Sequence, residues 1–153
     1  MSGLHVVLVE PEIPPNTGTT ARLCAATDTT LHLVGPLGFS LEDRYLRRAG
    51  LDYWPHVRLR SHASWEDFRT SKPTAPLYLF SAQASRPYTS VSYRPGDYLV
   101  FGGETRGLPA SLLEEHRDRA LRIPMSNPNV RSLNLANAAA IVLYEALRQL
   151  GRA

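Results

Sequence analysis

Residues 132–150 carry the longest helical pattern in the sequence, and the rest of the chain has to pack around it. At 3.6 residues per turn, the apolar side chains of this stretch fill about half of the helix circumference. A surface helix that covers a single core needs an apolar stripe of only about 100°. The alanines of the stretch also allow another backbone to approach closely. We therefore expect a helix buried on two sides, against its own sheet and against a partner subunit.

The other arc of this helix is polar and includes Asn134, Asn137 and Tyr144. Polar groups beside so apolar a surface are costly to bury unless they are hydrogen-bonded or face a ligand. The helix pattern alone favours the simpler interpretation, in which the asparagines bond to neighbouring backbone groups. A role at a ligand site is the alternative.

The length of 153 residues predicts one domain that spans 1–153. No apolar run approaches the roughly 20 residues that a bilayer requires, and no signal-peptide pattern is present, so we expect a cytoplasmic protein without a membrane partner. Cys24, the single cysteine, lies in a helix-core pattern typical of a small buried hydrophobe. The five histidines have no ligand spacing, so no metal site is predicted.

Strand-like and helix-like patterns alternate along the chain. The strand-like runs are 4–10, 30–34, 57–60, 77–80, 97–101 and 120–123. The expected helices are 17–26 with Asn16 as the N-cap, 43–49, 65–69, 110–115 with Pro109 at its first position, and the long C-terminal helix. This alternation predicts an α/β fold with a mostly parallel sheet flanked by helices. Such a sheet binds ligands outside the carboxyl ends of its strands.

Three polar segments follow predicted strands. The first, 11–22, places Asn16 and Arg22 six residues apart at a strand-to-helix turn. The second, 102–109, is rich in glycine but fits neither the dinucleotide fingerprint nor the P-loop. The third is 123–137. Taken alone, the first is better explained as a capped helix and the second as a plain turn. Together they occupy the edge where an α/β sheet holds its ligand.

The formal net charge of +3 makes a modest case for a polyanionic partner. Lys72 is the only lysine, and the other basic residues are arginines, which suit bidentate phosphate recognition. A general preference for arginine explains the count equally well, so the cluster of Arg44, Arg47 and Arg48 carries the argument.

Seven blocks of the chain, in this order, resemble the SPOUT (α/β-knot) RNA 2'-O-ribose methyltransferases. They look most like the small single-domain tRNA (cytidine/uridine-34)-2'-O-methyltransferases. The blocks are EPEIPPNTG at 10–18, RLCA at 22–25, LRRAGLDY at 46–53, GDY at 96–98, ETRGLPAS at 104–111, RIPM at 122–125, and Arg131-Ser132 with Asn134 and Asn137. The resemblance covers nearly the whole chain.

The resemblance implies a C-terminal trefoil knot that holds S-adenosylmethionine in a bent form, and a homodimer with each site built across the interface. The implied cofactor-binding residues are Phe80, Gly102, Gly103, Gly107, Leu108, Ile123, Met125, Ser132, Leu133 and Asn137. Much of this contact would come from the backbone, which suits the glycines.

The resemblance also implies that a ribose 2'-hydroxyl attacks the methyl group of the sulfonium. Arg22 is then expected near that hydroxyl, with Asn16, Glu104, Ser132 and Asn134 organising the site. A guanidinium hardly ever deprotonates in proteins. We therefore expect Arg22 to orient the hydroxyl and stabilise developing negative charge rather than act as the base.

The implied substrate is the anticodon stem-loop of tRNA. The residues expected to contact RNA are Arg44, Arg47, Arg48, Arg106, Arg131 and Tyr144. Methylation of another tRNA or ribosomal RNA position is one alternative, and a non-catalytic RNA-binding dimer is another. An oxidoreductase that uses a dinucleotide is disfavoured, because the chain lacks the fingerprint glycines and their acidic partner.

Overall fold

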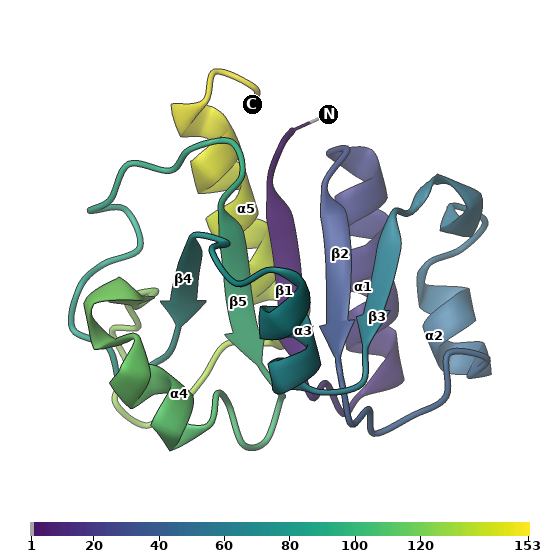
Figure 1. Cartoon of the computed structure of the whole chain (residues 1–153), viewed down its shortest axis with the longest axis horizontal. Helices are drawn as coiled ribbons and strands as arrows, with labels where there is room; N and C mark the ends of the chain where they lie inside the picture. The colour runs from purple at the N-terminus through teal and green to yellow at the C-terminus, as the bar shows by residue number, and fades with distance from the viewer. Residues whose placement is uncertain (1) are drawn as a thin grey trace.

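The computed structural model describes residues 2–153. Six parallel strands form the centre of the molecule (Figure 1). The strands are β1 (His5–Val9), β2 (Thr30–Val34), β3 (Leu59–His62), β4 (Leu77–Phe80), β5 (Tyr98–Gly102) and β6 (Ala120–Leu121). Their order in the sheet is β3-β2-β1-β5-β4-β6, and every strand pair is parallel. The predicted α/β fold with a parallel sheet is confirmed.

Helices cover both faces of the sheet. They are α1 (Pro14–Ala26), α2 (Arg44–Ala49), α3 (Trp65–Ser71), α4 (Ala110–Glu115) and α5 (Leu135–Gln149), with 3-10 turns at Trp54–His56 and Arg117–Arg119. In Figure 1, α1 and α5 lie side by side behind the sheet, and α3 and α4 lie in front of it. Within residues 2–153, no helix combines the length and hydrophobicity needed to cross a bilayer.

Strand side chains alternate between two hydrophobic cores. Leu8 and Leu99 pack towards α1 and α5, where they meet Leu143. Val7 and Val100 belong to the other core, together with side chains of α3 and α4. Because both faces of a parallel sheet are covered, its strands read as continuous apolar runs rather than alternating ones. This explains why the strand-like runs could be recognised in the sequence.

Helix α2 lies unusually close to α1 at Gly18. A Cβ atom at this position would come within 2.3 Å of the Leu46 carbonyl oxygen and 2.6 Å of the Ala49 Cβ. Only glycine allows this approach without displacing one of the two helices. The short helix α2 is therefore held against α1 by backbone contact.

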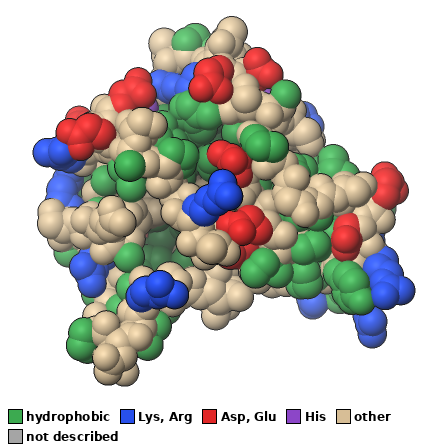
Figure 2. Space-filling view, turned by 90° about the horizontal axis from the view of Figure 1, so that it is seen from below, with side chains coloured by type: hydrophobic (Ala, Val, Ile, Leu, Met, Phe, Trp, Pro, Cys, Tyr) green, Lys and Arg blue, Asp and Glu red, His purple; other side chains and the backbone are tan. Residues whose placement is uncertain are grey.

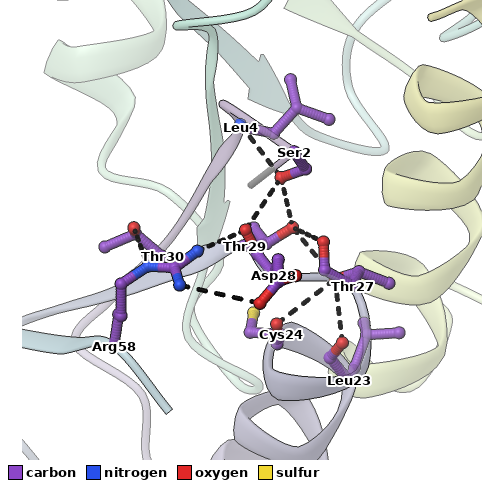
Figure 3. Close-up of polar contacts among 9 residues, drawn as sticks. All are labelled: Ser2, Leu4, Leu23, Cys24, Thr27, Asp28, Thr29, Thr30 and Arg58. Carbon is purple, nitrogen blue, oxygen red and sulfur yellow. Dashed lines mark hydrogen bonds and ion pairs between the residues drawn. The ribbon is translucent and has the colours of Figure 1, made fainter. Parts of the chain in front are cut away.

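A network of hydroxyl groups fixes the turn between α1 and β2 at the amino-terminal edge of the sheet (Figure 3). The Thr29 hydroxyl lies 2.9 Å from both the Ser2 hydroxyl and the Thr27 hydroxyl. Asp28, which has a positive φ of 52°, is contacted by Arg58 through its carbonyl oxygen and, at 3.7 Å, through its carboxylate. These contacts tie the turn to the chain entering β3.

Several predicted element boundaries differ from the structure. Helix α1 begins at Pro14, with Ile13 as its N-cap, so the prediction that Asn16 caps it is wrong. Two prolines start the helix because their fixed φ suits the first turn and their missing N–H groups need no partner there. Similarly, Pro109 is the N-cap of α4 rather than its first residue. The strand predicted at 57–60 is shifted to Leu59–His62, and α5 begins at Leu135.

The segment 81–97, between β4 and β5, contacts both the chain after β6 and the end of α5. The Arg122 backbone N–H donates to the Arg86 carbonyl at 2.7 Å, and the Tyr88 N–H donates to the Arg122 carbonyl at 2.8 Å. The Gln149 side chain accepts from the Tyr93 N–H at 2.9 Å and donates to the Val91 carbonyl at 3.1 Å. The trefoil threading of this region stays a prediction.

Candidate active site

A pocket of about 470 Å³ opens at the carboxyl ends of β4, β5 and β6. Viewed from this edge, the molecule has a hollow with hydrophobic side chains on its floor and basic side chains around it (Figure 2). The lining comes from three stretches of chain: 80–83, 101–108 and 123–138, with Leu113 of α4 added. The volume is within the range of small-molecule sites.

All of the predicted cofactor-binding residues except Asn137 line this pocket. They are Phe80, Gly102, Gly103, Gly107, Leu108, Ile123, Met125, Ser132 and Leu133. Asn137 is an exposed residue of α5. Sequence reasoning missed Ser81, Ala82 and Gln83. They directly follow β4, just as Gly102 and Gly103 lie at the end of β5. Their position at the carboxyl end of a predicted strand was the signal that could have identified them.

Close backbone contact shapes the glycine-rich wall. A Cβ atom on Gly102 would lie 2.1 Å from the Gly107 carbonyl carbon and 2.2 Å from the Leu108 nitrogen. Gly107 has a φ of +67°, and its N–H donates to the Gly103 carbonyl at 2.9 Å. The segment 103–107 is therefore a tight turn, and all of its residues line the pocket.

Glu104 anchors the beginning of α1. Its Oε1 accepts from the Glu12 backbone N–H at 2.7 Å, and its Oε2 accepts from the Ile13 N–H at 2.8 Å. Oε2 also accepts from the Asn16 side-chain amide at 3.2 Å. A carboxylate is favoured here because it satisfies the N–H groups of the N-cap residue and the residue before it, beside the positive end of the α1 dipole. With three donors on its two oxygens, Glu104 serves to position α1 against the pocket wall.

Asn134 bonds to a neighbouring backbone group, as the simpler interpretation of the helix pattern expected, and also to a second side chain. Its Oδ1 accepts from the Asn137 backbone N–H at 3.1 Å and caps α5. Its Nδ2 donates to Asn16 Oδ1 at 3.0 Å. Asn16 in turn donates to Glu104, so hydrogen bonds connect the starts of α1 and α5 with the glycine-rich turn. This arrangement brings together three of the predicted catalytic residues, while Ser132 lies in the pocket lining.

Comparison with known proteins decides the family. The sequence model of the SpoU rRNA Methylase family matches residues 3–144, which is most of the chain. The chain belongs to the SpoU rRNA Methylase family. The similarity proposed from the sequence motifs is thereby confirmed.

Two relatives and one solved structure are about half identical to this chain. A putative tRNA (cytidine(34)-2'-O)-methyltransferase of Geobacillus stearothermophilus is 52% identical over 149 residues, covering 95% of this chain and 94% of the relative. The tRNA (cytidine(34)-2'-O)-methyltransferase of Escherichia coli K12 is 48% identical, with coverages of 97% and 94%. A solved structure that concerns 2-OH methylation of C/U34 on tRNA has a TM-score of 0.92 at 50% identity, with coverages of 97% and 96%.

A more distant solved structure contains a bound ligand. It is the AdoMet-bound rRNA methyltransferase of Sinorhizobium meliloti, with a TM-score of 0.86 and 28% identity. The alignment covers 96% of this chain and 56% of that one. The shared part of the two structures is therefore nearly all of this chain and about half of the other.

Arg22 does not line the pocket. It is exposed on α1, and its guanidinium lies 5.3 Å from the centre of the Tyr53 ring. Arg106 and Arg131 do line the pocket. Tyr144, on the exposed side of α5, lines a separate cavity of about 280 Å³ near Ser2 and Asp28.

The basic cluster on α2 is exposed and paired with aromatic rings. The Arg44 guanidinium lies 4.8 Å from the centre of the Tyr45 ring, and that of Arg47 lies 5.0 Å from Trp54. Arg47 also lies 3.6 Å from the carboxylate of Glu42. Guanidinium groups held over aromatic faces keep a preferred orientation at modest energetic gain. Arg48 is exposed on the same helix.

Titratable groups outside the pocket include a row of three histidines on the α3 side of the sheet. His5 Nδ1 and His32 Nε2 are 3.0 Å apart, and His32 Nδ1 and His62 Nε2 are also 3.0 Å apart. Burial, with a contribution from Lys72, lowers the pKa of His5 to about 4. Burial and the neighbouring histidines lower the pKa of His32 to about 3.

Cys24 is fully buried, and this burial raises the pKa of its thiol to about 12. A thiol of this kind is neither nucleophilic nor a metal ligand at neutral pH, which confirms the prediction of a small buried hydrophobe. Among residues 2–153, no group of three or more His, Cys, Asp or Glu side chains is arranged to hold a metal ion.

Proposed function

We infer that this protein transfers a methyl group from S-adenosylmethionine to the ribose 2'-hydroxyl of the wobble nucleotide, cytidine or uridine 34, of tRNA. The observation that carries the inference is the convergence on one pocket of the glycine-rich turn and the segment 123–138, both of which contain blocks that resemble these methyltransferases. Relatives about half identical over almost the whole chain are named for this reaction, which supports the choice of tRNA position. Because tRNA is the substrate, we place the activity in the cytoplasm.

The pocket residues fit S-adenosylmethionine. The rings of Phe80 and Phe101 stack at 4.9 Å and give the pocket an apolar surface. The turn from Gly103 to Gly107 adds closely spaced backbone donors and acceptors, which suit the polar edges of a nucleoside. A side chain at Gly102 would displace this wall. When bound, the cofactor supplies a methyl group on a positively charged sulfur.

The protein has little covalent chemistry to perform, so positioning supplies most of the rate enhancement. Asn16, Asn134 and Glu104 hold α1 and α5 at the pocket mouth. Arg22 of α1 then orients the attacking hydroxyl and a neighbouring phosphate, and its fixed charge stabilises the developing alkoxide. Its permanently protonated guanidinium leaves removal of the proton to another acceptor.

We also propose that the enzyme acts as a homodimer. Three side chains on the outer side of α5 and the segment before it, Leu133, Ile141 and Tyr144, are between 37% and 47% exposed. Arg22 lies exposed on the neighbouring helix α1 and outside the pocket of its own protomer. A second copy packed on α1 and α5 would cover the apolar side chains, and would carry Arg22 of one protomer towards the pocket of the other.

The tRNA surface in this proposal extends from the pocket rim to α2. Arg106 and Arg131 lie at the rim, and Arg44, Arg47 and Arg48 lie on α2. Tyr45 and Tyr53 are exposed, and each ring lies beside an arginine. Exposed aromatic rings stack on unpaired bases in single-stranded RNA sites. The anticodon loop, which presents unpaired bases next to phosphates, is the ligand that suits this surface.

Tritiated methyl transfer to unmodified tRNA, followed by nucleoside mapping, tests the function. The expected product is 2'-O-methylcytidine or 2'-O-methyluridine at position 34. Ribosomal RNA is the second substrate to test, because the family and a distant neighbour are named for rRNA. Label at a ribosomal position and none at position 34 would contradict the proposal. Binding of tRNA is expected to weaken steeply with salt if the arginine surface contacts several phosphates.

A further inference from the structure

Glu12 connects the loop between β1 and α1 with the glycine-rich turn. Its Oε1 accepts a hydrogen bond from the Thr105 backbone N–H at 3.0 Å. The pKa of Glu12 is lowered chiefly by this backbone bond, with further contributions from the Thr105 side chain and from Arg106. The carboxylate is therefore the form that the turn favours.

Glu12 and Glu104 bind each other's loops in opposite directions. The Glu12 side chain accepts from the N–H of Thr105, the residue after Glu104. The Glu104 side chain accepts from the N–H of Glu12 itself at 2.7 Å. The loop after β1 thus supplies one carboxylate and two backbone donors, and the glycine-rich turn supplies one carboxylate and one backbone donor. Such a reciprocal pair fixes the separation and the rotation of the two loops more firmly than one bond alone.

Gly103 leaves the space through which the Glu12 side chain passes. A Cβ atom at position 103 would come within 3.0 Å of Glu12 Oε1 and within 2.5 Å of the Glu10 carbonyl oxygen. The two loops are therefore in contact at the backbone level, and the carboxylate of Glu12 closes over that contact.

The residues held by this pair belong to the reaction site. Thr105 and Arg106 line the pocket, and α1, which starts next to Glu12, carries Asn16 and Arg22. A shift of the Thr105 amide would change the pocket wall, and a shift of the loop before Pro14 would change the direction of α1. Both changes would alter the position of the attacking hydroxyl relative to the methyl donor.

We propose that Glu12 is a positioning residue for methyl transfer, which holds the rim of the cofactor pocket and the start of α1 in register through its bond to the Thr105 amide. This role rests on the function proposed above. Glu12 touches neither the methyl group nor the hydroxyl in this account, and it acts through Thr105 and Arg106.

Three variants test the role. Glu12→Ala removes the acceptor, whereas Glu12→Gln keeps an oxygen that can accept from the same N–H. Glu66→Gln, at an exposed position on α3, is the matched control for loss of one carboxylate. For Glu12→Ala we expect S-adenosylhomocysteine to bind about 10-fold more weakly, the effect of losing one hydrogen bond to a charged group. Its kcat on tRNA should fall by a similar factor, Glu12→Gln should recover most of both losses, and Glu66→Gln should match the wild type.

Hydrogen exchange at the Thr105 amide separates positioning from a general loss of stability. Exchange should accelerate at Thr105 and Arg106 in Glu12→Ala, while the unfolding temperature stays close to that of the wild type. Wild-type binding and turnover in Glu12→Ala would overturn the proposal, and so would equal impairment of Glu12→Ala and Glu12→Gln. Loss of cofactor binding and turnover in proportion to a lowered unfolding temperature would also overturn the proposal. Failure of the wild type to methylate tRNA would instead count against the proposed function, because cofactor binding and amide exchange are read without RNA.

Discussion

The side chains of Asn16 and Asn134, 118 positions apart in the chain, are joined by a 3.0 Å hydrogen bond from Asn134 Nδ2 to Asn16 Oδ1. The bond links the first turn of α1 to the N-cap of α5. Because Glu104 also bonds to Asn16, the two helices and the glycine-rich turn share one polar contact point. The geometry of the pocket mouth therefore depends on a side chain that also caps a helix.

The two roles of Asn134 can be separated by substitution. Asn134→Asp keeps an oxygen to cap α5 but has no N–H to donate to Asn16, so stability should change by less than about 1 kcal/mol while methyl transfer falls. Asn134→Ala loses both bonds and should cost about 1 kcal/mol or more of stability as well. Thermal unfolding and single-turnover methylation measure the two effects. Full activity in Asn134→Asp would show that the bond to Asn16 is dispensable.

Gly102→Ala should damage the pocket wall. The added Cβ would lie 2.1 Å from the Gly107 carbonyl carbon, so backbone has to move, at a cost of about 2–3 kcal/mol. Gly151→Ala is the comparison, because its Cβ meets nothing within 4 Å and only the positive φ of 71° is strained. For Gly151→Ala we expect denaturant unfolding to show a free energy of unfolding about 1 kcal/mol lower than that of the wild type. Similar stability of the two variants would mean that the wall can relax.

Arg22→Lys retains the positive charge and loses the planar fork of donors. We expect kcat on tRNA to fall by at least about 10-fold, while binding of S-adenosylhomocysteine is unchanged, because Arg22 is outside the pocket lining. Single-turnover kinetics measure the rate of methyl transfer, and calorimetry measures the affinity for S-adenosylhomocysteine. Near-wild-type methyl transfer would exclude a bidentate role for this arginine.

Ile141→Arg tests the proposed dimer. The side chain of Ile141 is 37% exposed on the outer side of α5, where an arginine should be tolerated in a monomer but not in an apolar interface. Sedimentation is expected to give a dimer for the wild type and a monomer for this variant. Thr70→Arg, on the exposed side of α3 across the sheet, should remain dimeric. A monomeric wild type would rule out the assembly.

Acid should destabilise the fold through the histidine row. The folded pKa values of His5 and His32, about 4 and about 3, lie below the ordinary value of 6.5. Between pH 6.5 and 4 the unfolded chain therefore binds more protons than the folded one, and stability falls as the pH falls. The unfolding temperature should drop over this range, and less steeply in His32→Phe. His56→Gln, at an exposed position, should retain the wild-type profile. An unfolding temperature that does not change from pH 6.5 to 4 would contradict the role of these buried histidines in acid destabilisation.

The sequence predicted the order of strands and helices because strands covered on both faces leave continuous apolar runs, as at β2 and β5. It also predicted the pocket edge, since parallel strands bring their carboxyl ends together. The side-chain partners could not be predicted in this way. Asn16 looked like a local cap, yet its partners are Glu104 and Asn134, and only the completed sheet places them nearby. The bond from Thr105 to Glu12 was invisible for the same reason.

The contact at Gly18 joins the helix that carries Arg22 to the helix that carries the proposed RNA-binding arginines. Helix α1 carries Arg22 and helix α2 carries Arg47, and at Gly18 no side chain of α1 separates it from the Leu46 carbonyl of α2. A tRNA phosphate bound on α2 would thus be held at a fixed offset from the guanidinium on α1. The position of the anticodon loop on α2 would then decide which ribose reaches the methyl donor. The fixed backbone spacing between α2 and α1 would in this way select the nucleotide that is methylated.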